Sequence, residues 1–213
     1  VLSQALDLFP SRFIHIGGDE CPKEHWKKCP VCQAKMKAEN LRNEDELQSY
    51  FVRRIEAFLN SRGRRLIGWD EILEGGIAPN AAVMAWRADK QSAAIAANAG
   101  HDVVMATTRH LYFDYPETVT PLEKVYSFEP VPPGLNPGQA SRILGAQAQM
   151  WTDNHPTEKE IERLVYPRAC AVSEVVWSPA GLRNYSGFVR RLSAHAQRLA
   201  ELGIDFDMPE EAG

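Results

Sequence analysis

Short apolar runs alternate with longer stretches of helical periodicity along most of the chain. The apolar runs have the length of strands, and several of them end in glycines, acids or tryptophans. They predict five strands, at residues 13–20, 64–71, 82–87, 102–106 and 143–151. Strands that alternate with helices predict a parallel sheet with right-handed crossovers, and so an α/β fold. No internal repeat or linker divides the pattern.

Several of the predicted helices begin at side chains suited to capping. Asn43 with Glu46, and Thr157 with Glu160, have the spacing of capping boxes, and Asp89 is expected to cap an Ala-rich helix. The helix after Asn43 is expected to bury a single apolar stripe. Its members are Leu47, Phe51, Ile55, Phe58 and Leu59.

The first predicted strand leads into two glycines and two adjacent acids, in the run Phe13-Ile14-His15-Ile16-Gly17-Gly18-Asp19-Glu20. In α/β folds, ligands bind at the carboxyl ends of the strands. Side chains 19 and 20 of a regular strand would point to opposite faces, but glycine can adopt backbone angles that turn both toward one pocket. The alternative is a strand end whose two acids simply face water.

Three of the five predicted strands end in a tryptophan, namely Trp69, Trp86 and Trp151. Carboxyl ends of parallel strands share one edge, so a pocket accounts for this placement better than the alternative of three core tryptophans. Indole faces stack on the C–H faces of pyranose rings, and carboxylates bond hydroxyl groups. The sequence therefore predicts a sugar-binding pocket.

Glycoside hydrolysis usually requires two carboxyl groups on opposite sides of the sugar, about 5–5.5 Å or 6.5–9.5 Å apart. Adjacent acids on one loop are poorly placed for that division of labour. One acid can instead protonate the leaving oxygen while the other holds a nucleophile that the substrate supplies. A 2-acetamido group can be that nucleophile, as in substrate-assisted glycosidases.

Composition excludes some classes of function. The chain has 213 residues and a net charge of −4, with no long basic run, so we expect neither a nucleic acid nor a membrane as partner. Residues 21–42 are expected to form a long polar loop with short helical pieces. This loop holds His25 and the clustered Cys21, Cys29 and Cys32, for which a zinc knuckle is one alternative and a disulfide or free thiols the other.

The run His15-Ile16-Gly17-Gly18-Asp19-Glu20 resembles the signature of family 20 glycoside hydrolases, the β-N-acetylhexosaminidases. Further stretches resemble that family in order and spacing over nearly the whole chain. They are Gly68 to Glu71, Met84 to Arg87, Tyr112 to Asp114, Gly145 to Trp151, and Pro167-Arg168 through Glu174 and Trp177.

The resemblance implies roles for particular residues. Glu20 would be the general acid and then the general base. Asp19 would hold the acetamido N–H, and Tyr112 would bond the acetamido carbonyl oxygen. No metal or cofactor is implied, and His15 is expected to be structural. The indoles would wall the acetamido pocket and the ring, and distal hydroxyls would be bonded by Asp114 and Asp153.

The family fold is a (β/α)8 TIM barrel, which typically takes about 250 residues. Residues 1–213 would form a single catalytic-domain portion that supplies strands four to eight, with a C-terminal helix from about residue 184. An open parallel sheet exposes an edge. Such a chain would be sticky, would pair with another chain through that edge, or would be part of a larger protein.

The implied substrates are glycans that end in N-acetylglucosamine or N-acetylgalactosamine, and the implied location is periplasmic or extracellular, although no signal peptide is visible. Two alternatives remain. One is a non-catalytic sugar-binding fragment of such a domain, because the first barrel strands are missing. The other is a metal-dependent hydrolase that uses His15, Asp19 and Glu20 with a cysteine site.

Overall fold

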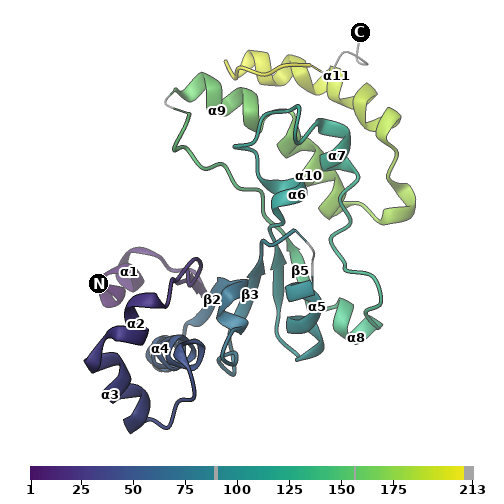
Figure 1. Ribbon diagram of the computed structural model, residues 1–213. Helices are drawn as coiled ribbons and strands as arrows, with labels where there is room; N and C mark the ends of the chain where they lie inside the picture. Colours follow the sequence, from purple (N-terminus) through teal and green to yellow (C-terminus); the bar gives the residue numbers. More distant parts are fainter. Residues whose placement is uncertain (89–90, 156, 209–213) are drawn as a thin grey trace. The chain divides into compact units, whose positions relative to one another are not determined.

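The computed structural model describes residues 1–88, 91–155 and 157–208 (Figure 1). Five parallel-type strands are hydrogen-bonded in chain order, β1-β2-β3-β4-β5. They are β1 Phe13–His15, β2 Arg65–Trp69, β3 Ala82–Ala85, β4 Val103–Met105 and β5 Ile143–Ala146. In the parallel register, Ile14 pairs with Leu66 and Gly68 with Val83. The predicted alternation of strands and helices is confirmed.

Helices occupy most of the connections between these strands. The α-helices are α1 Leu2–Leu8, α2 Glu24–Lys28, α3 Pro30–Ala38, α4 Glu44–Ser61, α5 Gln91–Asn98, α6 Thr108–Leu111, α7 Leu122–Tyr126, α8 Pro137–Ala140, α9 Glu158–Val165, α10 Arg168–Trp177 and α11 Tyr185–Glu201. Two 3-10 helices are η1 Asp70–Leu73 and η2 Ala180–Leu182. No helix in the described ranges is both long and apolar enough to cross a bilayer.

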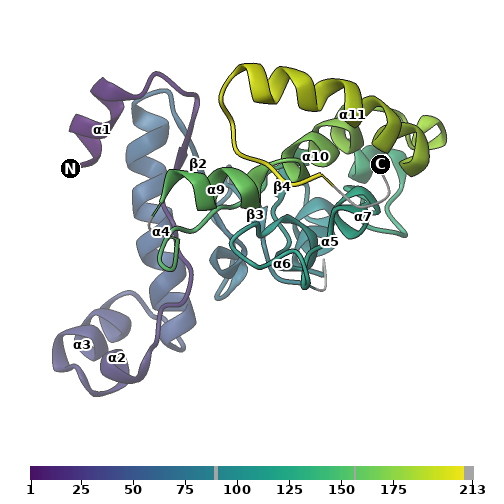
Figure 2. The same ribbon diagram turned by 90° about the horizontal axis from the view of Figure 1, so that it is seen from above.

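The chain divides into two compact units. The first comprises Val1–Ala85, Gln91–Val104 and Leu135–Arg142, and the remaining described residues form the second. In the first unit α4 packs against β2, where Val52 and Leu59 join Leu66 and Ile67 in the core. Figure 2 shows α2 and α3 at one end of α4 and α1 at the other.

The buried face of α4 differs from the predicted apolar stripe. Phe51 is 61% exposed, whereas Gln48, Ser49 and Glu56 are buried beside Val52 and Leu59. The three polar side chains bond backbone groups of neighbouring loops, as when the Glu56 carboxylate accepts a hydrogen bond from the Asn80 N–H at 2.7 Å. Leu59 is buried as predicted, and Leu47, Ile55 and Phe58 are half-buried, so the prediction was wrong for Phe51. Hydrophobic periodicity does not report hydrogen bonds to distant backbone groups, and for this reason it missed the buried polar residues.

One predicted capping box is confirmed and the other is half formed. Thr157 and Glu160 each accept from the other's backbone at the start of α9. The Asn43 side chain caps α4 by accepting from the Glu46 N–H at 3.0 Å, but the Glu46 carboxylate turns back to the Arg42 N–H. The cap expected at Asp89 lies outside the described residues.

The short helical pieces expected in residues 21–42 are present as α2 and α3, and they occupy most of that stretch. Some strand ends differ from the prediction. The first strand ends at His15 and not at residue 20. The fifth strand ends at Ala146, so Trp151 lies five residues beyond it and not at its end; the sheet is extended there by a single bridge between Tyr112 and Gln149. The apolar run continues to Trp151, but the regular strand does not. Apolar content alone therefore does not show at which residue a strand ends.

In the second unit α7 packs against α10. α11 contacts α7 through aromatic rings, and it contacts α10 through the ion pair of Arg191 with Glu174. Phe188 stacks on Tyr126 with ring centroids 4.9 Å apart. The predicted α11 face is confirmed for Phe188, Leu192 and Leu199, which are 2–4% exposed, and Ala196 is half-buried.

Candidate functional site

The acid loop, residues Gly17 to Glu20, follows β1 with a left-handed backbone. Gly17 has φ 76°, Gly18 has φ 103° and Glu20 has φ 45°. A Cβ on Gly18 would lie 2.7 Å from Cγ2 of Ile72, so both the angle and the space favour glycine there. The glycines do bend the strand end, as the sequence predicts.

Three hydrogen bonds fix the acid loop to its surroundings. The Gly17 carbonyl accepts from the Trp69 N–H at 3.0 Å, and the Gly17 N–H donates to Nδ1 of His15 at 3.1 Å. Nε2 of Gln48 on α4 donates to the Gly18 carbonyl at 2.8 Å. The loop is therefore held from β2 and from α4, while the Asp19 and Glu20 side chains remain exposed.

Trp69 lies at the carboxyl end of β2, as predicted, and is half-buried. The ring of His15 meets it in an edge contact, with centroids 4.8 Å apart and an interplanar angle of 64°. Loss of hydration around the imidazole lowers the pKa of His15 below its ordinary 6.5, and the nearby Asp19 charge opposes this shift. Neutral His15 can accept the Gly17 N–H, which suits a structural role.

Asp70 follows Trp69 and is fully buried in η1. Its carboxylate accepts a hydrogen bond from the Ser92 hydroxyl on α5. This bond ties the turn after β2 to the helix after β3 inside the first unit. Asp70 therefore supports the end of the strand that carries Trp69.

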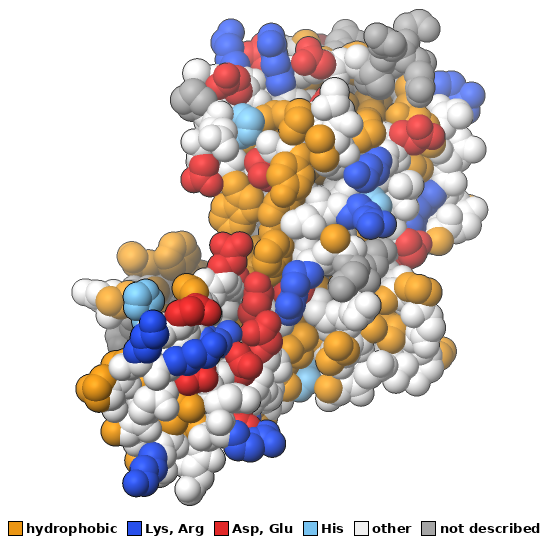
Figure 3. Space-filling model, in the orientation of Figure 1, with side chains coloured by type: hydrophobic (Ala, Val, Ile, Leu, Met, Phe, Trp, Pro, Cys, Tyr) orange, Lys and Arg blue, Asp and Glu red, His pale blue; other side chains and the backbone are white. Residues whose placement is uncertain are grey.

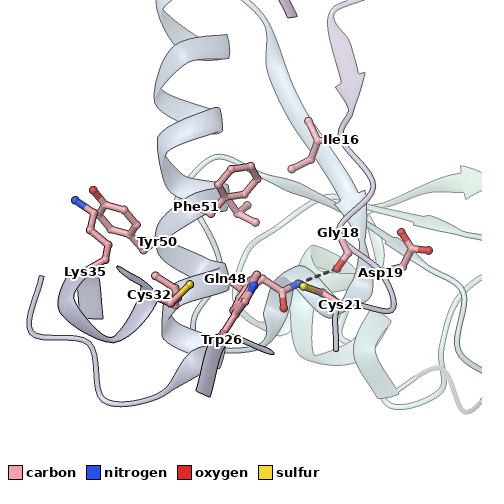
Figure 4. Close-up of a pocket in the computed structure, with 12 residues that line it drawn as sticks. Ile16, Gly18, Asp19, Cys21, Trp26, Cys32, Lys35, Gln48, Tyr50 and Phe51 are labelled. Atoms are coloured by element: carbon pink, nitrogen blue, oxygen red, sulfur yellow. Dashed lines mark hydrogen bonds between the residues drawn. The ribbon is translucent and has the colours of Figure 1, made fainter. Parts of the chain in front are cut away.

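The first unit also contains a pocket of about 520 Å³ beside the acid loop (Figure 4). The acid loop contributes Gly18 and Asp19 to the lining of the pocket. Ile16, the residue directly after β1, also lines the pocket. The remaining walls come from the segment through α2 to α4. They are Cys21, Trp26, Cys32, Lys35, Leu47, Gln48, Tyr50, Phe51 and Val52.

The cysteines near this pocket are free thiols, and Cys170 in α10 is also free. Within the described ranges, no group of three or more His, Cys, Asp or Glu side chains is arranged to hold a metal ion. The zinc-knuckle alternative for Cys21, His25, Cys29 and Cys32 has no support from this arrangement.

Charged side chains around α2, α3 and α4 are of mixed sign on the face shown in Figure 3. Lys23, three residues after Glu20, pairs with both Asp45 and Glu74 at 3.2 Å. These two ion pairs tie the segment that leaves the acid loop to the start of α4 and to the turn after η1.

In the second unit Trp86 directly follows β3 and stacks on Tyr112, with centroids 6.3 Å apart and an interplanar angle of 28°. Tyr112 in turn stacks on Tyr115 at 6.1 Å. Tyr112 is 8% exposed. Two of the predicted pocket residues, Trp86 and Tyr112, are thus brought together as a small aromatic stack.

The segment that carries Tyr112 is held by Arg168, to which the sequence analysis gave no role. Arg168 has no exposed surface and lies at the start of α10. Its guanidinium donates to the carbonyl groups of Phe113, Tyr115 and Thr120 at 2.6, 3.0 and 3.2 Å, and Nε donates to that of Leu164 at 2.7 Å. Burial lowers the pKa of Arg168 to about 10, while the charges of Glu117 and Asp114 oppose the shift.

A sequence signal for Arg168 exists. It lies three, four and seven residues before Ala171, Val172 and Val175, which form the buried face of α10. A lone arginine on an apolar helical face is rarely tolerated without partners, so it indicates a buried network.

Three further predicted residues of the second unit are Asp114, Trp151 and Asp153. Asp114 is half-buried, and its Oδ1 has no hydrogen-bond partner among the described residues. Trp151, 46% exposed, and Asp153, also exposed, lie in the stretch after β5. Asp19, Glu20 and Trp69 thus belong to the first unit, and the other five predicted residues to the second.

Comparisons with known proteins match nearly the whole chain. The model of glycosyl hydrolase family 20, catalytic domain, matches residues 1–180. A protein named beta-hexosaminidase from Porphyromonas gingivalis is 42% identical over 221 residues, which is 98% of this chain and 28% of that protein. Another of that name, from Akkermansia muciniphila, is 32% identical over 100% of this chain and 45% of its own length.

A solved structure extends the comparison to the fold. The GH20 exo β-N-acetylglucosaminidase from Vibrio harveyi, in complex with N-acetylglucosamine, matches with a TM-score of 0.88 and 29% identity, over 98% of this chain and 35% of that chain. The predicted fold class, an α/β fold that forms part of a TIM barrel, is confirmed. This chain spans less than half the length of these relatives. It belongs to glycosyl hydrolase family 20 and matches the catalytic domain of that family.

Proposed function

We propose that the protein hydrolyses terminal non-reducing N-acetyl-β-D-hexosamine residues from glycans. The observation that carries the proposal is the acid loop, in which a left-handed backbone at Gly17, Gly18 and Glu20 presents two adjacent exposed carboxylates after β1. The names of the relatives, beta-hexosaminidases, support the same reaction. Glycans that end in N-acetylglucosamine or N-acetylgalactosamine are the proposed substrates.

The adjacency of the two acids favours substrate-assisted, retaining catalysis. Glu20 gives its proton to the glycosidic oxygen as the bond to C1 breaks, and the acetamido carbonyl oxygen of the substrate attacks C1. Asp19 accepts the acetamido N–H and stabilises the positive charge of the oxazolinium intermediate. Water then attacks C1 as the bond from C1 to the acetamido oxygen breaks, which regenerates the acetamido group. The Glu20 carboxylate takes a proton from this water, so the acid is restored and the configuration is retained.

The residues of the second unit complete this proposal. The Tyr112 hydroxyl bonds the acetamido carbonyl oxygen, and its stack on Trp86 restricts the ring to one orientation. Trp69, Trp86 and Trp151 wall the sugar, while Asp114 and Asp153 bond distal hydroxyls. Asp114 has an oxygen without a described partner, which leaves an acceptor for such a hydroxyl.

The alternative function is a non-catalytic sugar-binding fragment, which would keep the pocket residues without turnover. The exposed acid pair favours the enzyme, because binding alone needs no acid able to reach a glycosidic oxygen. We also propose a periplasmic or extracellular location, where such glycans occur, and pairing with another chain through the sheet edge at β1 where that edge is left open.

Release of nitrophenol from its N-acetyl-β-glucosaminide and from its plain β-glucoside tests the proposal. Turnover of the first substrate alone supports participation of the acetamido group, which the glucoside lacks. Equal turnover of both substrates would contradict it. Binding of N-acetylglucosamine without turnover of either substrate would favour the sugar-binding alternative, and insensitivity to chelators would dismiss a metal-dependent hydrolase.

A further inference from the structure

The peptide group between Gly18 and Asp19 is held by a side chain from a distant part of the chain. Gln48 on α4 donates from Nε2 to the Gly18 carbonyl oxygen at 2.8 Å, and Figure 4 shows this bond between the helix and the loop. The Gly18 carbonyl and the Asp19 N–H belong to one rigid peptide plane. The bond from Gln48 therefore fixes the direction in which the Asp19 side chain leaves the backbone.

The acid loop needs such a restraint. Gly18 has φ 103° and Glu20 has φ 45°. Residues other than glycine rarely adopt a positive φ, so the backbone at Glu20 is unusual. Backbone of this kind persists only where its surroundings hold it. Without the donor from α4, the peptide between residues 18 and 19 is free to rotate. The carboxylates of Asp19 and Glu20 would then shift with it.

Stability alone does not account for a glutamine at position 48. The residue is 4% exposed, and its Oε1 is buried without a partner among the described residues. A methionine has a similar length and would fill this space without burying an unsatisfied amide oxygen. What methionine lacks is the N–H that reaches Gly18.

We propose that Gln48 is a positioning residue for Asp19 and Glu20. It acts through the 18–19 peptide and has no contact with the substrate. The inference rests on the proposed function, because it concerns how the acid pair of that reaction is aligned.

Ser49 offers a matched control on the same helix. It is 2% exposed, and its hydroxyl donates to the Gly76 carbonyl, in a loop that does not carry the acids. Both Gln48→Met and Ser49→Ala remove one buried hydrogen bond from an α4 side chain to a loop carbonyl. Only the first is expected to disturb the acid loop.

The experiment measures kcat, KM and Tm for the unaltered protein, Gln48→Met and Ser49→Ala, each expressed from the complete gene, with nitrophenyl N-acetyl-β-glucosaminide as substrate. We expect kcat to fall about 10- to 100-fold in Gln48→Met, because small displacements of catalytic groups have effects of that size. KM should change far less than kcat. Ser49→Ala should keep its kcat, whatever its Tm.

A crystal structure of Gln48→Met provides the second measurement. A rotated 18–19 peptide is expected, and an unchanged peptide would overturn the inference, as would equal kcat values in the two variants. If the unaltered protein releases no nitrophenol, the proposed function fails, and the orientation of that peptide then decides the positioning role by itself.

Discussion

Arg168 donates a hydrogen bond of 2.6 Å to the carbonyl oxygen of Phe113, the residue that follows Tyr112 in the chain. The same guanidinium also lies over the Phe113 ring, with Cζ 4.7 Å from the ring centroid. One buried cation thus fixes both the backbone and the side chain next to the tyrosine proposed to bind the acetamido group. The stability of this segment should depend on it.

Arg168→Met is expected to lower the free energy of unfolding by about 3–5 kcal/mol, because it leaves several buried carbonyl groups without donors. Urea unfolding of the variant and of the unaltered protein measures the loss. Arg198 on α11 is exposed, so Arg198→Met makes the same exchange without breaking a buried network. A similar cost for both variants would show that the network is not the cause.

Gly18→Ala is expected to destabilise the first unit by about 2–4 kcal/mol, since it combines a left-handed residue with a steric clash. The added methyl would lie 2.7 Å from Cγ2 of Ile72. Gly63 has φ 69° and open space around its Cβ position, so Gly63→Ala isolates the backbone cost. Thermal unfolding of the two variants compares them, and equal shifts in Tm would dismiss the clash with Ile72.

His15 is expected to make stability depend on pH. Its pKa is lowered in the folded state, so the unfolded chain binds the proton more readily. The stabilising contribution is therefore fully present above 6.5, the ordinary pKa, and is lost as the pH falls below that value. Protonation also removes the acceptor for the Gly17 N–H.

His15→Gln keeps an acceptor at this position but cannot titrate near neutral pH. The unfolding free energy of the unaltered protein should decline more steeply than that of His15→Gln as the pH falls from about 7 to 5, around the ordinary pKa of histidine. Parallel curves would mean that His15 does not contribute to the pH dependence.

Glu20→Gln is expected to slow substrates with poor leaving groups far more than activated aryl glycosides. A good leaving group departs without a proton, so it needs the acid less. Rates on nitrophenyl N-acetyl-β-glucosaminide and on an N-acetylglucosamine disaccharide measure this difference. An equal loss on both substrates would contradict the acid role.

Asp19→Asn should lower kcat for N-acetyl substrates by about 100- to 1000-fold, the size of effect seen when one electrostatic stabiliser of a transition state is removed. The amide keeps the shape of the side chain but cannot stabilise the positive charge of the oxazolinium intermediate. Steady-state kinetics on the nitrophenyl substrate provide the measurement. A variant with normal turnover would remove Asp19 from the mechanism.

The sequence by itself determined the features that depend on local chemistry. Apolar runs and caps located five strands and the main helices, and Thr157 with Glu160 marked the start of α9. The glycines before Asp19 indicated a bend in the acid loop, because glycine is the residue that adopts a left-handed backbone most readily. Position in the chain also placed Trp69 and Trp86 where β2 and β3 end.

Only the tertiary structure decided which polar side chains are buried and what they hold. Phe51 is apolar and exposed, whereas Gln48 is polar and buried, because Gln48 satisfies a carbonyl group 30 residues away in the chain. Arg168 likewise joins carbonyl groups that lie up to 55 residues from it. Hydrophobic periodicity reports the average environment along one helix, but a hydrogen bond to a distant backbone group depends on where the folded chain brings that group.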